Sequence, residues 1–285
     1  MELWYRKLGF YNNPFSIKPG AFHDEVIGYN LGDFLEKIDT GNIQYVKADY
    51  GNGKTTMLKH IVHKFGGRKM VAFCSCNIAE KNIDTKELLL GRAFINKALR
   101  IIPKNMILLV DEAQDITKEE ANDILDYFEK GNIKSVVFFG TEIKPKNFPK
   151  KLSQHLNGNI IALSNLSPEK AVEIVRKRIG DAPVLSDAII KKLYSISGYN
   201  PRRLLENCED LCKYVISRNE NSATDRHVKT LFGQIKTKTV VRLKRKLEPE
   251  IKIEELDTRK DKVNLKFDYS NIRTYEEEMS FGRKV

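Results

Sequence analysis

Residues 48–56, Ala48-Asp49-Tyr50-Gly51-Asn52-Gly53-Lys54-Thr55-Thr56, decide the fold of this chain. Residues 43–48 lead into them and predict a strand, and the periodic pattern of residues 54–65 predicts a helix after them. A glycine-rich turn between a strand and a helix is typical of a phosphate-binding loop. The glycines let backbone N–H groups point at an anion, and the helix N-terminus adds the positive end of its dipole.

This loop predicts a site for a nucleotide with magnesium. We expect Lys54 to reach the β- and γ-phosphates and the Thr55 hydroxyl to bind Mg²⁺. Ala48 stands where the strict pattern has glycine, and a glycine-rich turn that binds nothing is the alternative. The candidates for nucleotide binding in the loop are Gly51, Asn52, Gly53, Lys54, Thr55 and Thr56.

A second acidic element follows the continuous apolar run 106–110, which predicts a strand buried on both faces. Asp111 stands at the tip of that strand, where a carboxylate can hold Mg²⁺ through water. Glu112 is the next residue, and we expect it to polarise the water that attacks the γ-phosphate. Two ordinary acids at a solvated strand end are the alternative.

Strands and helices alternate through the first 165 residues, which predicts an α/β core with a parallel sheet. The predicted strands are 43–48, 69–74, 106–110, 135–139 and 159–163, and the predicted helices are 31–38, 54–65, 85–100 and 117–130. A capping box, Thr117-x-x-Glu120, opens the last of these helices.

The periodicity becomes purely helical after residue 163. Ser167-Pro168 predicts a helix start, and residues 185–196, 201–217 and 224–234 predict three further helices. We therefore expect a core at 1–165, a small all-helical lid at 166–235 and a charged C-terminal extension at 236–285. Residues 250–254 and 262–267 of the extension alternate as two short strands would.

These motifs resemble those of AAA+ P-loop ATPases. Asp111-Glu112-Ala113-Gln114-Asp115 matches the Walker B box of that family, and residues 135–141 match its next strand. The resemblance implies that Thr141 is the sensor 1 residue, which reads the γ-phosphate or its water. Gly198-Tyr199-Asn200-Pro201-Arg202-Arg203 resembles the sensor 2 motif, which implies that Arg202, or else Arg203, reaches the nucleotide from the lid. Ordinary basic residues in a first helical turn are the alternative.

Within the family, the sequence resembles the initiator-like group of origin-recognition, ExeA-type and transposition-regulator ATPases. Asn13-Pro14-Phe15-Ser16, the Walker B box and the lid motif carry this likeness. It implies ATP-dependent work at DNA, in replication or transposition. It also implies that Val26-Ile27-Gly28 borders the adenine, with Ile27 as the candidate contact.

The chain departs from the family pattern in two respects. No arginine lies between Arg100 and Arg176, where the family carries an arginine finger. That region offers only basic residues of other kinds, namely Lys144, Lys146, Lys150, Lys151 and His155, and the four lysines are expected in a proline-containing loop. Hydrolysis is then slow, or the chain is a nucleotide switch, or a partner or second copy supplies the arginine. The 50 residues after 235 are also too few for a winged-helix domain.

The net charge of +11 over 285 residues favours a polyanionic partner. Its densest part is a basic strip made of Lys236, Lys238, Arg242, Lys244, Arg245 and Lys246. The strip predicts contact with DNA phosphates, and a solvated linker is the alternative. Residues 269–285 mix aromatic and charged side chains, which is typical of a protein-docking tail or of a tail that packs on its own domain.

Composition excludes several classes. A hydrophobic content of 41% excludes wholesale disorder, and no apolar run approaches the roughly 20 residues that a membrane helix needs. The N-terminus lacks the pattern of a signal peptide, so we expect a cytoplasmic protein. The spacings Cys74/Cys76 and Cys208/Cys212 do not match a zinc ribbon and predict buried, reduced thiols.

The prediction is thus an ATPase that uses ATP and Mg²⁺ to drive DNA-associated assembly or remodelling. The alternative is an ATP-dependent assembly factor or switch that acts on a protein or ribonucleoprotein complex through its C-terminal tail.

Overall fold

The computed structural model describes residues 3–17, 26, 28, 29, 31–66, 70–77, 83–91 and 101–233. Within it, 1–231 form one compact unit. The predicted contact residue Ile27, the basic strip, the two short strands at 250–254 and 262–267 and the C-terminal tail lie outside the described residues.

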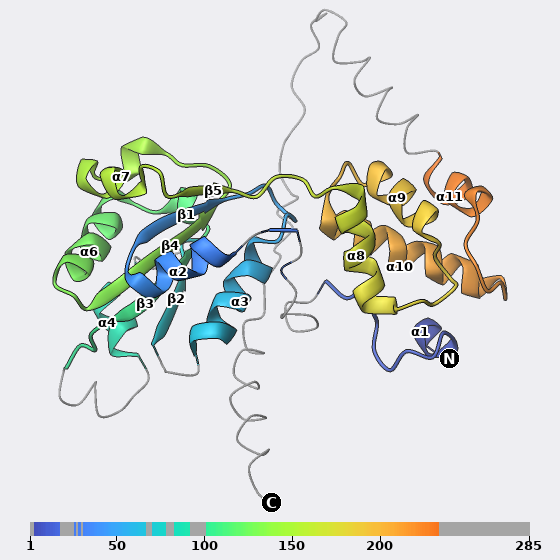
Figure 1. Ribbon diagram of the computed structural model, residues 1–285, viewed down its shortest axis with the longest axis horizontal. Helices are drawn as coiled ribbons and strands as arrows, with labels where there is room; N and C mark the ends of the chain where they lie inside the picture. The colour runs from blue at the N-terminus through green and yellow to red at the C-terminus, as the bar shows by residue number, and fades with distance from the viewer. Residues whose placement is uncertain are drawn as a thin grey trace, which may run out of the picture. The chain divides into compact units, whose positions relative to one another are not determined.

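Five parallel strands form the sheet of the core, in the spatial order β2-β3-β4-β1-β5 (Figure 1). Non-consecutive neighbours in this order require helical crossovers between the strands, which confirms the predicted α/β class. The strands are β1 (Ile43–Lys47), β2 (Val71–Ser75), β3 (Met106–Asp111), β4 (Ile133–Gly140) and β5 (Ile160–Ala162).

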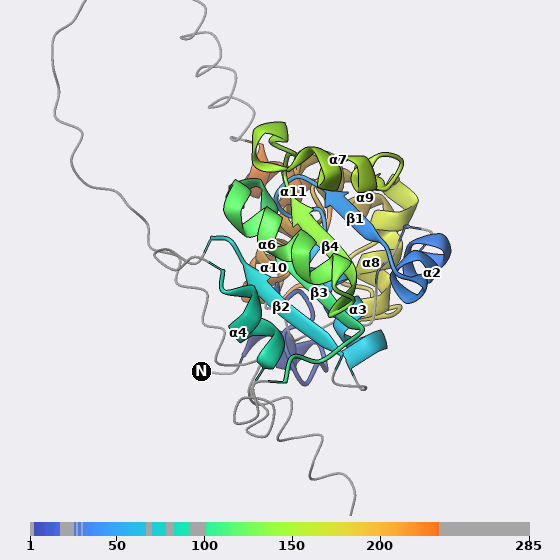
Figure 2. The same ribbon diagram turned by 90° about the vertical axis from the view of Figure 1, so that its left-hand side faces the viewer.

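Helices cover both faces of this sheet (Figure 2). On one face α2 (Gly32–Thr40) and α3 (Lys54–Gly66) pack through Ile38 and Met57 against alternate side chains of β3 and β4. The other face is covered by α4 (Thr85–Leu90), α6 (Lys118–Glu129) and α7 (Lys150–Leu156). Alternation along each central strand therefore buries both faces, as the continuous apolar runs predicted.

The segment predicted as a lid, which keeps that name below, consists of helices that follow the last strand. They are α8 (Pro168–Ile179), α9 (Asp187–Ile196), α10 (Pro201–Ser217) and α11 (Asp225–Phe232). Each of the first three begins at a side-chain cap, because Ser167, Ser186 and Asn200 accept hydrogen bonds from backbone N–H groups in the first turn. Pro168 and Pro201 occupy the first helical position, where the missing N–H costs nothing.

The N-terminal segment packs against the lid, an arrangement that sequence reasoning missed. Helix α1 (Trp4–Lys7) contacts α10, and the Trp4 ring stacks on the fully buried Phe15 at 6.2 Å between centroids. Arg178 of α8 donates to the carbonyls of Pro14 (3.3 Å) and Ser16 (3.1 Å). The Asn-Pro-Phe-Ser stretch therefore serves as an anchor for this segment on the lid.

Two expectations need correction. Lys150 and Lys151 lie in α7 rather than in a proline-containing loop, because the chain re-enters a helix directly after Pro149. Cys74 and Cys76 are only half-buried, since they lie at and just beyond the end of the edge strand β2. All four thiols are free, and Cys208 and Cys212 are buried as predicted.

The structure describes only the first part of the helix predicted over residues 85–100. This part is α4, which ends at Leu90, and residues 92–100 lie outside the described residues. No helix in the described part of the chain is long and apolar enough to cross a membrane.

The capping box of α6 gives a test of local stability. Thr117 accepts from the Glu120 N–H (3.2 Å), and the Glu120 carboxylate accepts from the Thr117 N–H (2.8 Å). We expect Thr117→Ala to lower the free energy of unfolding by about 1 kcal/mol in urea titration. Thr40→Ala, at an exposed helix end, is the control and should change it by less than about 0.5 kcal/mol. If both variants lost the same free energy of unfolding, the capping box would contribute no more than an ordinary exposed threonine.

Candidate nucleotide-binding site

The loop between β1 and α3 has the backbone that its glycines predict. Gly51 has φ +86° and Gly53 has φ +91°, a region in which side chains are strained. Lys54 begins α3 and is only 8% exposed. Its Nζ donates to the Ala48 carbonyl at 2.6 Å and to the Asp49 carbonyl at 3.3 Å. The ammonium thus lies inside the curve of the loop, where phosphates are expected.

Burial lowers the pKa of Lys54, and the charges of Glu112, Asp111 and Asp49 oppose that shift. The lysine therefore lies within electrostatic reach of the acids at the end of β3. Thr55 and Thr56 follow in the first turn of α3, with Thr55 exposed and Thr56 half-buried. Their hydroxyls stand at the same helix N-terminus as the loop.

Asp111 is the last residue of β3, as predicted. Burial raises the pKa of its carboxyl, while a hydrogen bond from the Glu112 N–H (3.0 Å) and the charge of Lys54 lower it. A half-buried carboxylate at the end of β3 and a threonine hydroxyl in the first turn of α3 are the kinds of group that suit Mg²⁺, which binds through one or two carboxylates plus waters and substrate phosphates. No group of three or more His, Cys, Asp or Glu that could hold a metal occurs among the described residues.

Glu112 follows in the left-handed conformation, with φ 52° and ψ 38°. This conformation is uncommon for a residue with a side chain, and it occurs at active sites. The Glu112 carboxylate accepts from Nε2 of Gln114 at 2.7 Å. The turn at the strand end therefore projects this side chain into a polar cluster rather than into bulk solvent.

Thr141 comes directly after β4, which pairs with both β1 and β3. Its N–H donates to Oε1 of Gln114 at 3.2 Å. The carboxyl ends of three neighbouring parallel strands thus bring the loop lysine, the two acids and Thr141 to the same edge of the sheet. Of the residues predicted to bind the nucleotide or to catalyse hydrolysis, only Ile27 lies outside the described part of the chain.

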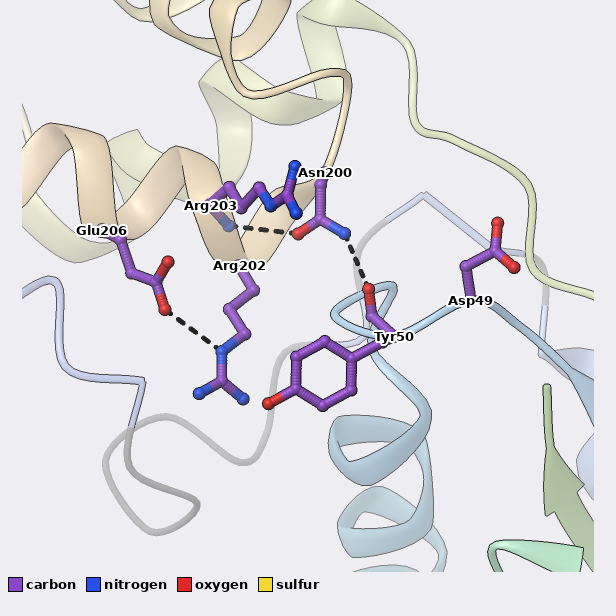
Figure 3. Close-up of a pocket in the computed structure, with 6 residues that line it drawn as sticks. All are labelled: Asp49, Tyr50, Asn200, Arg202, Arg203 and Glu206. Carbon is purple, nitrogen blue, oxygen red and sulfur yellow. Dashed lines mark hydrogen bonds and ion pairs between the residues drawn. The ribbon is translucent and has the colours of Figure 1, made fainter. Parts of the chain in front are cut away.

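The lid motif meets the loop directly (Figure 3). Asn200 accepts from the Arg203 N–H (3.1 Å) and so caps α10, and its Nδ2 donates to the Tyr50 carbonyl (2.7 Å). The same pocket holds Arg202, whose guanidinium lies 4.9 Å from the centre of the Tyr50 ring and whose Nε donates to Glu206 at 3.2 Å. Arg202 is therefore held by a ring and a carboxylate beside the loop.

Gly51 matters for this approach as well as for the turn. A Cβ built there would lie 2.6 Å from Oδ1 of Asn200 and 3.1 Å from Cβ of Arg202. Asn52 adds a second tie, because its Nδ2 donates to Oδ1 of Asn165, just before the lid, at 3.3 Å. A glycine in the loop therefore lets the lid motif reach the backbone of the loop.

The contacts of four residues beside the site could not be predicted from the sequence. Tyr50 lies in the phosphate-binding loop and Asn200 in the lid motif, but their contact joins residues 150 positions apart. Gln114 lay within the Walker B box, and its bonds depend on the fold of β4. The sequence suggests Lys144 only as a cation in place of an arginine finger, whereas it pairs with Asp115 at 3.3 Å and with Glu142 at 3.8 Å in its own chain.

No protein-family model and no curated protein matches the sequence. Solved structures do match its fold. Cdc6p from Pyrobaculum aerophilum gives a TM-score of 0.58 at 13% identity, over 76% of this chain and 69% of that one. Orc1 of Aeropyrum pernix, solved in complex with DNA, gives 0.55 at 14%, over 80% and 71%.

A third match is the Holliday junction branch migration motor RuvB of Thermotoga maritima, with a TM-score of 0.53 at 16% identity over 78% of each chain. These structures are AAA+ P-loop ATPases, so the predicted AAA+ fold is confirmed. At these identities the likeness concerns the fold.

The contact between lid and loop gives a prediction. Asn200→Asp keeps an oxygen that caps α10 but removes the donor to the Tyr50 carbonyl. We expect the amide hydrogen of Asn52 to exchange about fivefold faster, because one hydrogen bond contributes about 1 kcal/mol. Asn165→Asp keeps the acceptor for Asn52 and is the control, with no change expected. An unchanged exchange rate in Asn200→Asp would show that the lid does not restrain the loop.

Proposed function

We propose that this chain binds ATP with Mg²⁺ at the loop between β1 and α3 and hydrolyses it. The observation that carries the proposal is the buried Lys54 ammonium, which lies within the loop and within electrostatic reach of Asp111 and Glu112. A lysine in a glycine-rich loop after β1, near acids at the end of β3, is a typical arrangement for phosphoryl transfer. The AAA+ fold supports the same assignment.

Each side chain then has a defined task. Backbone N–H groups of Gly51, Asn52 and Gly53 and the first turn of α3 bind the phosphates, and Lys54 adds its charge. Thr55 and Asp111 would hold the metal, which when bound neutralises charge on the β- and γ-phosphates.

Glu112 polarises the attacking water as general base, and the Thr141 hydroxyl contacts the γ-phosphate or that water. Thr56, the third residue of α3, completes the phosphate site.

Arg202 has a task that requires movement. It is paired with Glu206 and covers the Tyr50 ring, so a γ-phosphate must compete with both for the guanidinium. The phosphate offers bidentate, charge-assisted bonds, which are stronger than a half-exposed ion pair on one helix. Nucleotide binding thereby becomes coupled to the lid.

In this proposal the turnover rate depends on a second cation at the γ-phosphate. No arginine that could supply it lies between Arg100 and Arg176. Lys144 is paired with acids of its own chain, and lysine lacks the planar fork. We therefore propose slow hydrolysis by the isolated chain, with acceleration when a second copy or a partner supplies an arginine.

Two substitutions test the catalytic assignment. We expect Lys54→Ala to abolish binding of a fluorescent ATP analogue. Glu112→Gln should bind it normally but release phosphate about 10²-fold to 10⁴-fold more slowly, because a general base contributes that much. Lys64→Ala, at an exposed position near the other end of α3, is the matched control. Unchanged hydrolysis in Glu112→Gln would refute the role of that residue.

We further propose that the ATPase works at DNA. The matched Orc1 was solved in complex with DNA, and the basic strip adds six cations within 11 residues of this chain. DNA contact through such a strip loses affinity steeply with salt, since each neutralised phosphate releases counterions. The process would be replication or transposition, as the initiator-like resemblance implies.

The DNA proposal predicts ATP-dependent binding to duplex DNA that weakens about a thousandfold between roughly 50 and 200 mM salt. Replacing the six cations of the strip by glutamine should abolish it. The matched control replaces six cations elsewhere in the same extension, Lys252, Arg259, Lys260, Lys262, Lys266 and Arg273. No retention on DNA at low salt, with a protein captured through residues 236–285 instead, would favour the assembly factor that acts through its tail.

A further inference from the structure

Gln114 connects two catalytic candidates through one side-chain amide. It lies in the short 3₁₀ helix η1 (Ala113–Asp115), two residues after Glu112. Its Nε2 donates to Oε2 of Glu112 at 2.7 Å and to Oδ2 of Asp115 at 3.3 Å. Its Oε1 accepts from the N–H of Thr141 at 3.2 Å. The amide therefore bridges the end of β3 and the end of β4.

The orientation of this amide follows from its neighbours. The NH₂ group faces two carboxylates, which only accept hydrogen bonds, and the oxygen faces an N–H, which only donates. A flipped amide would place its oxygen against both carboxylates and its NH₂ against the Thr141 N–H. Both donors and one acceptor position of Gln114 are thus used in a single arrangement.

The end of β4 is shaped to admit this amide. A Cβ at Gly140 would lie 2.9 Å from Oε1 of Gln114 and would also collide with the Tyr45 hydroxyl. That hydroxyl donates to the Glu142 carbonyl at 2.6 Å and so holds the backbone just beyond Thr141. Oε1 of Gln114 therefore contacts the end of β4 between Gly140, which has no room for a Cβ, and Glu142, whose carbonyl is held by Tyr45.

Glu112 needs such a restraint. Its backbone is in a sparsely populated conformation, and its side chain has three rotatable bonds. A carboxylate accepts about four hydrogen bonds, so the bond from Gln114 fixes its direction and leaves lone pairs for a water. A general base acts only when it lies within hydrogen-bond reach of the proton that it removes.

We propose that Gln114 is a positioning residue that sets the direction of the Glu112 carboxylate and ties it to the Thr141 end of β4. This inference rests on the proposed ATPase function and concerns the control of that same site. A displacement of β4 at Thr141, where the γ-phosphate is sensed, is transmitted to the base through one amide. Asp115 takes the second N–H and keeps the amide from rotating.

The kinetic test uses Gln114→Met, which keeps the length of the side chain and removes its hydrogen bonds. We expect kcat for ATP hydrolysis to fall about tenfold or more, because a small misplacement of a catalytic group is costly, while KM changes less than about twofold. Gln154→Met, an exposed glutamine of α7, is the matched control and should leave both constants unchanged. A change in KM as large as the fall in kcat for Gln114→Met, or no change in either constant, would overturn the proposal.

A double-mutant comparison separates positioning from general damage. If Gln114 acts through Glu112, then adding Gln114→Met to Glu112→Gln should cause no further loss in single-turnover hydrolysis. An additional loss equal to that in the unaltered background would assign Gln114 a role independent of the base and would contradict the inference.

A third measurement does not depend on turnover. In ¹⁵N spectra of the nucleotide-free chain, Glu112→Ala should shift the side-chain NH₂ signal of Gln114, and Gln114→Met should shift the backbone amide of Thr141. Unmoved signals would refute the tether. If the tether is seen but the unaltered chain hydrolyses no ATP, the proposed function fails separately from the tether, and the catalytic role of Gln114 fails with it.

Discussion

The parallel pairing of β1, β3 and β4 is the constraint on which the site depends. It places the carboxyl ends of three strands at one edge, and the loop, Asp111 and Thr141 each follow one of those ends. The apolar side chains of the strands are buried on both faces by helices, so the edge has little freedom to spread. Charged and polar groups brought together there meet in a partly dehydrated setting, which strengthens their interactions.

This setting is visible in the behaviour of its ionisable groups. Burial lowers the pKa of Lys54 and raises that of Asp111, and the two charges partly compensate one another. The Lys54 ammonium is bonded to loop carbonyls, and Arg202 is bonded to Glu206. Under the proposed function, both cations would exchange these internal partners for phosphate oxygens when a nucleotide binds, and the contact of Asn200 with the loop would link that exchange to the position of the lid.

Much of this arrangement could be predicted from the sequence. Periodicity and capping residues predict the five strands and most of the described helices to within a few residues, since those signals are local, but they do not predict α1 or α7. The positions of Lys54, Asp111, Glu112 and Thr141 followed from motifs at strand ends. The anchoring of Phe15 on the lid could not be predicted, because it joins segments about 160 residues apart.

The central claim concerns a nucleotide at the Lys54 loop, and a crystal structure with Mg²⁺ and a non-hydrolysable ATP analogue tests it most directly. The account predicts that Nζ of Lys54 leaves the Ala48 carbonyl and contacts the β- and γ-phosphates, with Asp111 beside the metal. A nucleotide bound elsewhere, with Lys54 still bonded to Ala48, would contradict the account.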